Sequence, residues 1–137
     1  MKTLTPNLAV KNIKETISFY RDILGFELMM AVPEDQSGFG VEIDESKHYI
    51  WAMMQNGGVK LMLQEKENLK EDIGDFFDDI GASVSLYIEV DDVDALYKKL
   101  SEKVEIVKDI ETTWYGMREF YIKDCNGYIL AFALQVE

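Results

Sequence analysis

The stretch WYGMREFYIKDCNGYILAFAL, residues 114–134, decides the fold of this chain. Its centre, Asp124-Cys125-Asn126-Gly127, has the chemistry of a tight turn, because Asn and Gly tolerate positive φ and Asp can bond forward to the backbone. Apolar residues alternate with other residues on both sides of this turn, from Phe120 before it to Leu134 after it. Such alternation is typical of half-buried strands. The stretch therefore predicts a β-hairpin.

The chain carries the same pattern in both of its halves. VKNI at residues 10–13 matches VDDV at residues 90–93, and each segment takes a strand end into the start of a helix. NGG at residues 56–58 matches CNG at residues 125–127, and each turn is followed by an apolar strand. A duplication of this kind fixes the architecture before any site is considered. It predicts the order β-α-β-β-β, a linker, and β-α-β-β-β again.

The expected helices begin after N-cap residues. Asn12 and Asp92 are the candidate caps, and Gly25 is placed to end the first helix. The third expected strand is apolar on both parities, which predicts burial on both of its faces. The strands expected before the hairpin cover residues 4–10, 26–32, 48–56, 59–65, 83–90 and 104–109.

These elements predict one α+β domain that covers residues 1–137. Its first module spans about residues 1–65, an acidic linker with a helical turn or two spans residues 66–82, and the second module spans about residues 83–137. A helix can cover only one face of a small sheet, so the other face of each sheet is free to line a cavity. We expect two tandem βαβββ modules that form a curled mixed-sheet half-barrel around a cavity, with the helices outside.

The composition excludes several classes of function. The net charge of −12 repels nucleic acids and anionic lipids, so neither is an expected partner. No apolar run approaches the ~20 residues that span a bilayer, and the cytoplasm is the expected location. The single cysteine, Cys125, excludes an internal disulfide and a zinc cluster built on cysteines. The acidic surface fits either simple solubility or attraction of a cationic small molecule, and charge alone does not separate the two.

The chain resembles the vicinal oxygen chelate superfamily, which includes glyoxalase I, bleomycin-resistance proteins and ring-cleaving dioxygenases. The resemblance covers nearly the whole chain and is strongest in LAVKNIKETISFYRDILGFEL (residues 8–28) and YGMREFYIKDCNGYILAF (residues 115–132). Cys125 stands where the family usually has proline. The resemblance implies the duplicated fold described above and a cavity lined by the sheets.

In metal-using members of this family, four ligands project from the first and fourth strands of the two modules. The equivalent positions in this chain are Thr5, Met62, Ser85 and Ala131, which do not offer the imidazole or carboxylate ligands of a hard divalent site. The only histidine, His48, lies at the start of a third strand, away from these positions. The prediction is therefore that the protein uses no metal and no cofactor.

The other residues that strand alternation directs toward the expected cavity have aromatic, flexible or small side chains. They predict a pocket for a small-molecule ligand. For each aromatic residue, packing in the core or in a dimer is an equal alternative, and Arg118 could pair with Glu119 or Glu89 instead of a ligand. No catalytic residue is identified. The predicted ligand-binding residues are Trp51, Met53, Met62, Ser85, Tyr87, Glu89, Trp114, Tyr115 and Arg118.

The function predicted from these residues is that of a metal-free small-molecule-binding protein, similar to the bleomycin-resistance branch. It would act as a homodimer and sequester a cationic or aromatic compound such as an antibiotic. One alternative is a metal-dependent lyase, isomerase or dioxygenase of the glyoxalase type with divergent ligands. Another is a regulatory domain whose cavity faces a protein partner.

Overall fold

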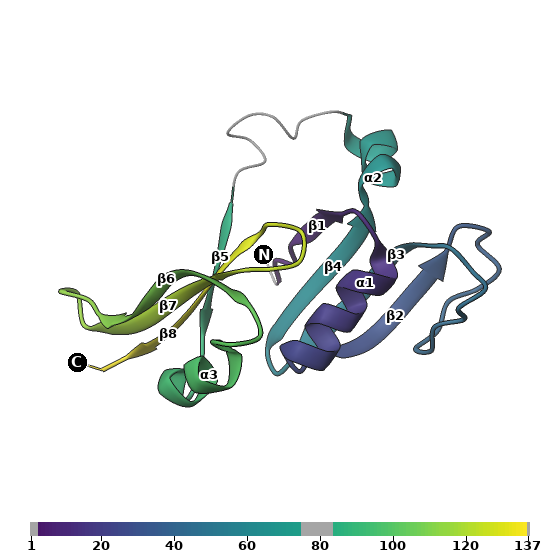
Figure 1. The fold of residues 1–137 in the computed structure, drawn as a ribbon. Coiled ribbons are helices and arrows are strands. Elements are labelled where there is room, and N and C mark those ends of the chain that lie inside the picture. The colour runs from purple at the N-terminus through teal and green to yellow at the C-terminus, as the bar shows by residue number, and fades with distance from the viewer. Residues whose placement is uncertain (1–2, 75–83, 137) are drawn as a thin grey trace. The chain divides into compact units, whose positions relative to one another are not determined.

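The chain forms two compact units, Met1–Asp78 and Asp79–Glu137, which we call module 1 and module 2. The computed structural model describes residues 3–74 and 84–136. Both modules contain a four-stranded mixed sheet with a helix packed on one face (Figure 1). The duplicated pattern of the sequence is therefore a duplicated structure.

Module 1 has the strand order β1-β4-β3-β2, in which only the β1–β4 pair is parallel. Helix α1 packs against β3 and β4. The elements of module 1 are β1 (Asn7–Val10), α1 (Ile13–Ser18), the π-helical turn η1 (Phe19–Ile23), β2 (Glu27–Pro33), β3 (Tyr49–Asn56), β4 (Val59–Glu65) and α2 (Lys66–Ile73).

Local chemistry explains where α1 starts and where its continuation ends. The side chain of Asn12 accepts a hydrogen bond from the backbone N–H of Glu15 at 3.0 Å, which confirms the predicted N-cap. Gly25 follows η1 with a φ of 75°, a conformation that glycine adopts without strain. Between these ends, the apolar side chains of Ile13, Ile17 and Tyr20 are buried. They form the module's core with the sheet face beneath α1.

Module 2 repeats the arrangement with the strand order β5-β8-β7-β6, and its β5–β8 pair is parallel. The predicted hairpin is confirmed: the Asp124 carboxylate accepts hydrogen bonds from the backbone N–H groups of Asn126 and Tyr128, both at 2.8 Å. Asp92 caps α3 as predicted. The elements are β5 (Ser85–Glu89), α3 (Val93–Leu100), β6 (Glu105–Thr112), β7 (Met117–Lys123) and β8 (Ile129–Gln135).

The predicted α+β class with two tandem βαβββ modules is confirmed, and neither sheet closes on itself. The first strand is shorter than predicted, because it starts at Asn7 instead of Leu4. Pro6 has no N–H to donate to a ladder, although its carbonyl still accepts from the N–H of Met62 at 2.8 Å. Helix α2 occupies the first part of the predicted linker, whereas residues 75–83 lie outside the described residues.

The prediction that the third strand is buried on both faces was wrong. Ala52 and Met54 are fully buried beneath α1, but Trp51 and Met53 on the other parity are only half-buried. The apolar run therefore supplies one core face and one face that is partly accessible. Among residues 3–74 and 84–136, no helix has both the length and the apolar character that crossing a membrane requires.

Candidate functional site

Each sheet has one face beneath its helix and one face away from it, which we call the open face. In module 2, the ring of Phe120 lies 5.2 Å from that of Tyr97 in α3, so the parity of Phe120 is the helix-covered one. The open face consequently carries Tyr121, its cross-strand partner Ala131, and Tyr87, which is the β5 partner of Ala131. In module 1, the open face carries Met62 with its partners Met53 and Asn7.

The open face of module 1 is mostly apolar and partly accessible. Trp51, Met53 and Met62, all predicted site residues, share this face and are half-buried, as are Met30 and Val32 of β2. Methionine side chains adapt their shape to a contacting surface, and tryptophan offers a large flat one. This face is suited to contact apolar groups without directing hydrogen bonds to them.

One polar side chain of module 1's open face, Gln64, is buried and holds α2 against the sheet. Its Oε1 accepts a hydrogen bond from Asn7 Nδ2 at 2.8 Å. Its Nε2 donates to Asn68 Oδ1 and Asp72 Oδ2, both at 2.7 Å. All of these partners belong to module 1, so Gln64 has a structural role that leaves no polar atom directed at a ligand.

The open face of module 2 combines small residues with large polar ones. The side chains of Ala131 and Ala133 in the central strand β8 are fully buried. Tyr87 and Tyr121 flank Ala131, and Glu119 is the β7 partner of Ala133. The alanines themselves are covered, so the tyrosine rings supply the accessible apolar surface of this part of the face.

Glu119 is the polar centre of this face, and the sequence alone did not identify it as a site residue. Its carboxylate is fully buried, with 0% of the residue exposed. Tyr87 donates its phenol proton to Oε2, and Tyr115 donates its own to Oε1, both at 2.5 Å. Lys108 Nζ lies 4.0 Å from Oε1. The one available signal was parity, since Glu119 shares the cavity parity of Tyr121 on a strand otherwise rich in apolar residues.

Both phenols remain protonated at neutral pH. Desolvation, followed by the hydrogen bond to Glu119, raises the pKa of Tyr87 above its ordinary value. The hydrogen bond to Glu119, followed by desolvation, raises the pKa of Tyr115. Lys108 stays charged, because its hydrogen bond to Glu111 and the nearby carboxylates raise its pKa. The cluster therefore consists of a carboxyl group that accepts hydrogen bonds from two neutral phenols, with an ammonium group nearby.

The remaining predicted residues of module 2 lie in different places. Trp114 is 95% exposed, and its ring meets that of Tyr115 edge-on at 5.3 Å. Ser85 and Glu89 are exposed on the open-face parity of β5. Arg118 has the helix-covered parity, and its partner is neither Glu119 nor Glu89: its guanidinium binds Asp94 of α3 at 3.0 Å. Arg118 is thus directed away from Tyr87.

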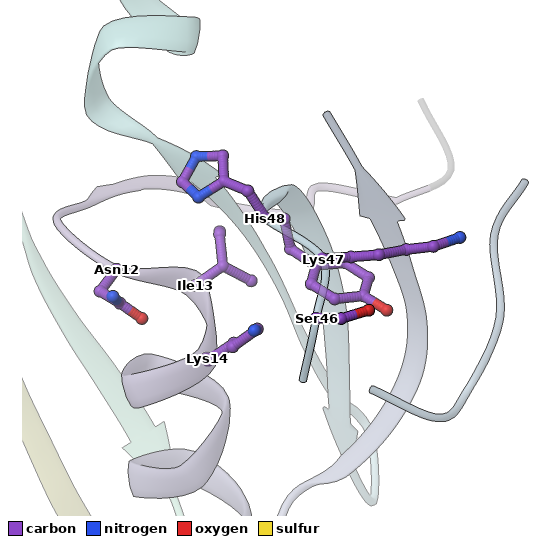
Figure 2. Close-up of a pocket in the computed structure, with 7 residues that line it drawn as sticks. Asn12, Ile13, Lys14, Ser46, Lys47 and His48 are labelled. Carbon is purple, nitrogen blue, oxygen red and sulfur yellow. The ribbon is translucent and has the colours of Figure 1, made fainter. Parts of the chain in front are cut away.

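A hollow of about 270 Å³ lies between the start of α1 and the segment before β3 in module 1 (Figure 2). Its basic side chains already have partners. Lys14 donates to the carbonyl of Glu45 at 2.9 Å, Lys47 to Ser37 Oγ at 2.8 Å, and His48 Nε2 lies 2.5 Å from Glu65. The hollow is lined by Asn12, Ile13, Lys14, Ser46, Lys47, His48 and Tyr49, none of them a predicted site residue.

The model of the Glyoxalase/Bleomycin resistance protein/Dioxygenase superfamily matches residues 3–132. The chain belongs to this superfamily. Bleomycin resistance proteins of Geobacillus stearothermophilus and Staphylococcus aureus are each 25% identical to it over 135 residues, which are 96% of this chain and 96% of each relative. The fold, the duplication and the predicted family therefore agree.

Solved structures show the same fold. The bleomycin-binding protein of bleomycin-producing Streptomyces verticillus, complexed with copper(II)-bleomycin, is 23% identical, with a TM-score of 0.60 and 96% of each chain covered. A protein of unknown function from Agrobacterium tumefaciens is 24% identical, with a TM-score of 0.70, and the match covers 98% of this chain and 94% of that one. At these identities, the likeness establishes the shared glyoxalase-type architecture.

The donor set of metal-using superfamily members does not fit this chain. Met62 and Ala131, two of the positions predicted to be equivalent to metal ligands, lie on the open faces of the two modules, and an alanine supplies no ligand atom. Ser85 begins β5, and Thr5 lies two residues before β1. Among residues 3–74 and 84–136, no group of three or more His, Cys, Asp or Glu side chains is arranged to hold a metal ion. That the protein works without a metal stays a prediction.

Proposed function

We propose that this protein binds an aromatic small molecule that carries positive charge, and that it sequesters the compound without a metal and without converting it. The observation that carries the proposal is the open face of module 2. There, Ala131 stands where a metal ligand would be, and tyrosine rings flank it on both neighbouring strands. The alanine supplies no ligand atom, and the neighbouring tyrosines offer ring surface to an aromatic compound instead.

Charge and relatives support the same class of ligand. The net charge of −12 favours cations over anions near any open face. The relatives that match nearly the whole chain are bleomycin resistance proteins, and one solved structure of this fold holds copper(II)-bleomycin. An antibiotic of this chemical type, with flat rings and a cationic group, is the compound class that we assign to this protein.

The chain's two tryptophans allow a direct test, because one lies in each module: Trp51 in β3 and Trp114 before β7. Bleomycin and a panel of aromatic cations are titrated into the wild type, Trp51→Phe and Trp114→Phe while the fluorescence is followed. In the Trp51→Phe variant, Trp114 alone reports on module 2. We expect saturable quenching of that signal. A panel that leaves both single-tryptophan variants unchanged would contradict the proposed function.

We also propose that the protein acts as a homodimer, because grooves often form between subunits in this superfamily. Sedimentation velocity at increasing protein concentration, with and without the compound that binds best, measures the assembly directly. The expected result is a species of about twice the mass of 15.8 kDa that persists on dilution. A monomer in both conditions would remove the dimer from the proposal and leave ligand binding untouched.

A further inference from the structure

The phenols of Tyr87 and Tyr115 are joined through one buried carboxylate, and their outer surfaces are accessible. Tyr87 is 51% exposed and Tyr115 is 49% exposed, although Glu119 between them is completely covered. We propose that these two phenol oxygens form a pair of hydrogen-bond acceptors that selects ligands with N–H donors, such as a primary ammonium or an amidinium. This inference rests on the proposed function and specifies which group of the ligand is recognised.

The pair is selective because both phenol protons already form hydrogen bonds to Glu119. A phenol has one proton to donate, and both phenols donate it to Glu119 at 2.5 Å. The lone pairs that remain on each phenol oxygen can only accept. A ligand that offers a carbonyl or a carboxylate to this pair therefore finds no donor, whereas an N–H group finds two acceptors.

The charge of Glu119 strengthens these acceptors for a cation. A hydrogen bond to an ionised acceptor polarises the donor, so each phenol oxygen becomes a better acceptor than an isolated phenol. Lys108 offsets part of this charge from 4.0 Å, but its ammonium group is itself hydrogen-bonded to Glu111 at 2.9 Å. The buried carboxylate thus acts on the ligand through the tyrosines without contacting it.

The contrast with Gln64 argues against a purely structural cluster. Gln64 is also buried on an open face, but it binds Asn7, Asn68 and Asp72 and secures α2 to the sheet. Within residues 3–74 and 84–136, Glu119 makes no hydrogen bond to a helix, and its two phenol partners are half-exposed. Trp114, which meets Tyr115 edge-on, adds an exposed ring on which an aromatic ligand can stack beside the acceptor pair.

The test compares two probes of equal charge, benzylammonium and benzyltrimethylammonium, of which only the first carries N–H donors. Fragments of this size bind with dissociation constants on the order of millimolar, so chemical shifts in two-dimensional NMR spectra are the readout. The wild type is expected to bind benzylammonium about tenfold more tightly than the quaternary probe. Equal affinity for the two probes, or no binding of benzylammonium, would overturn the acceptor pair.

Three variants locate the effect. Tyr87→Phe and Tyr115→Phe each remove one acceptor and should reduce the preference for benzylammonium to about threefold or less, while binding of the quaternary probe is retained. Tyr97→Phe is the matched control, because the Tyr97 phenol also donates to a carboxylate, that of Asp109, but lies in α3 on the helix-covered face. A preference that survives in both Tyr87→Phe and Tyr115→Phe would also overturn the inference.

The outcomes separate this inference from the proposed function. If the compounds of the tryptophan titration bind but the two probes do not differ, the protein is a binding protein without the acceptor pair. If no compound of that titration binds while benzylammonium is preferred and the Phe variants lose the preference, the acceptor pair stands and the proposed sequestration of a bleomycin-like antibiotic is wrong. Retained thermal unfolding profiles in the variants show that loss of preference is not loss of fold.

Discussion

The open faces of the two modules share a register and differ in chemistry. In module 1, Met62 lies between Met53 and Asn7, and in module 2, Ala131 lies between Tyr121 and Tyr87. The strand order and the parallel first pair are the same in both sheets. One face is thus adaptable and apolar, whereas the other has small residues surrounded by phenols and acids.

This difference shows which part of a duplicated fold is free to change. The helix-covered faces of both modules are filled by buried apolar side chains such as Leu61 and Leu130, because each must pack beneath a helix. The open faces carry no such constraint. The residues of each open face therefore depend on what that face contacts. The polar open face of module 2 is suited to more specific contacts than the apolar open face of module 1.

The largest expected effect is on Glu119. Glu119→Ala leaves two phenols without their acceptor and empties a fully buried position. We expect the free energy of unfolding to fall by about 3 kcal/mol. Denaturant unfolding followed by circular dichroism measures this. Glu111→Ala, at the exposed cross-strand position on β6, is the control and should change it by less than about 0.5 kcal/mol.

Gln64 tests the corresponding polar group of module 1. Gln64→Ala removes three hydrogen bonds and should lower the free energy of unfolding by about 2 kcal/mol. Because its partners all lie within module 1, the ligand affinity reported by Trp114 should stay within a factor of about two of the wild type. A large loss of affinity with intact fold would show that the two open faces do not differ in role.

Alkaline pH should affect the tyrosine cluster of module 2. The pKa values of Tyr87 and Tyr115 are raised in the folded protein, so their contribution to stability is complete below the unfolded value of about 10 and is lost as the pH rises above it. Tyrosinate absorbance during a pH titration follows their ionisation. Glu119→Gln removes the negative charge and should let these phenols ionise at lower pH. An unchanged titration curve in Glu119→Gln would contradict the coupling.

The smallest effect on stability is expected at Trp114, which is nearly fully exposed. Trp114→Ala should change the free energy of unfolding by less than about 0.5 kcal/mol but weaken ligand binding about tenfold. Trp51→Ala, at a half-buried position, should lower the free energy of unfolding more than Trp114→Ala does, and it should weaken ligand binding less. Calorimetric titration of both variants checks this, and the reverse ranking of affinities would move the site to module 1.

Local chemistry made most of the fold predictable. The caps at Asn12 and Asp92 and the turn at Asp124 each depend on residues within four positions, which the sequence displays directly. The environment of Glu119 was not predictable, because Tyr87 is 32 residues away in sequence and joins the cluster only through the parallel β5–β8 pair.

The partner of Arg118 illustrates the same limit. Sequence reasoning offered acids near it in the strands, but the chain folds so that α3 brings Asp94 beneath β7. Side-chain parity then separates Arg118 from Glu119, although the two are neighbours in sequence. Contacts made across helix and sheet follow from tertiary packing and not from any local pattern.

We propose above that the protein holds its ligand without a metal and without converting it. Equilibrium dialysis tests both parts of this proposal. One sample of protein is treated with a chelator and another is supplied with divalent metal, and each is dialysed against the compound of the titration panel that binds most tightly. The compound is then recovered and its mass is measured by mass spectrometry. We expect equal affinity in both samples and an unchanged mass for the recovered compound. Binding that disappears with the chelator and returns with metal, or a recovered compound of altered mass, would contradict it.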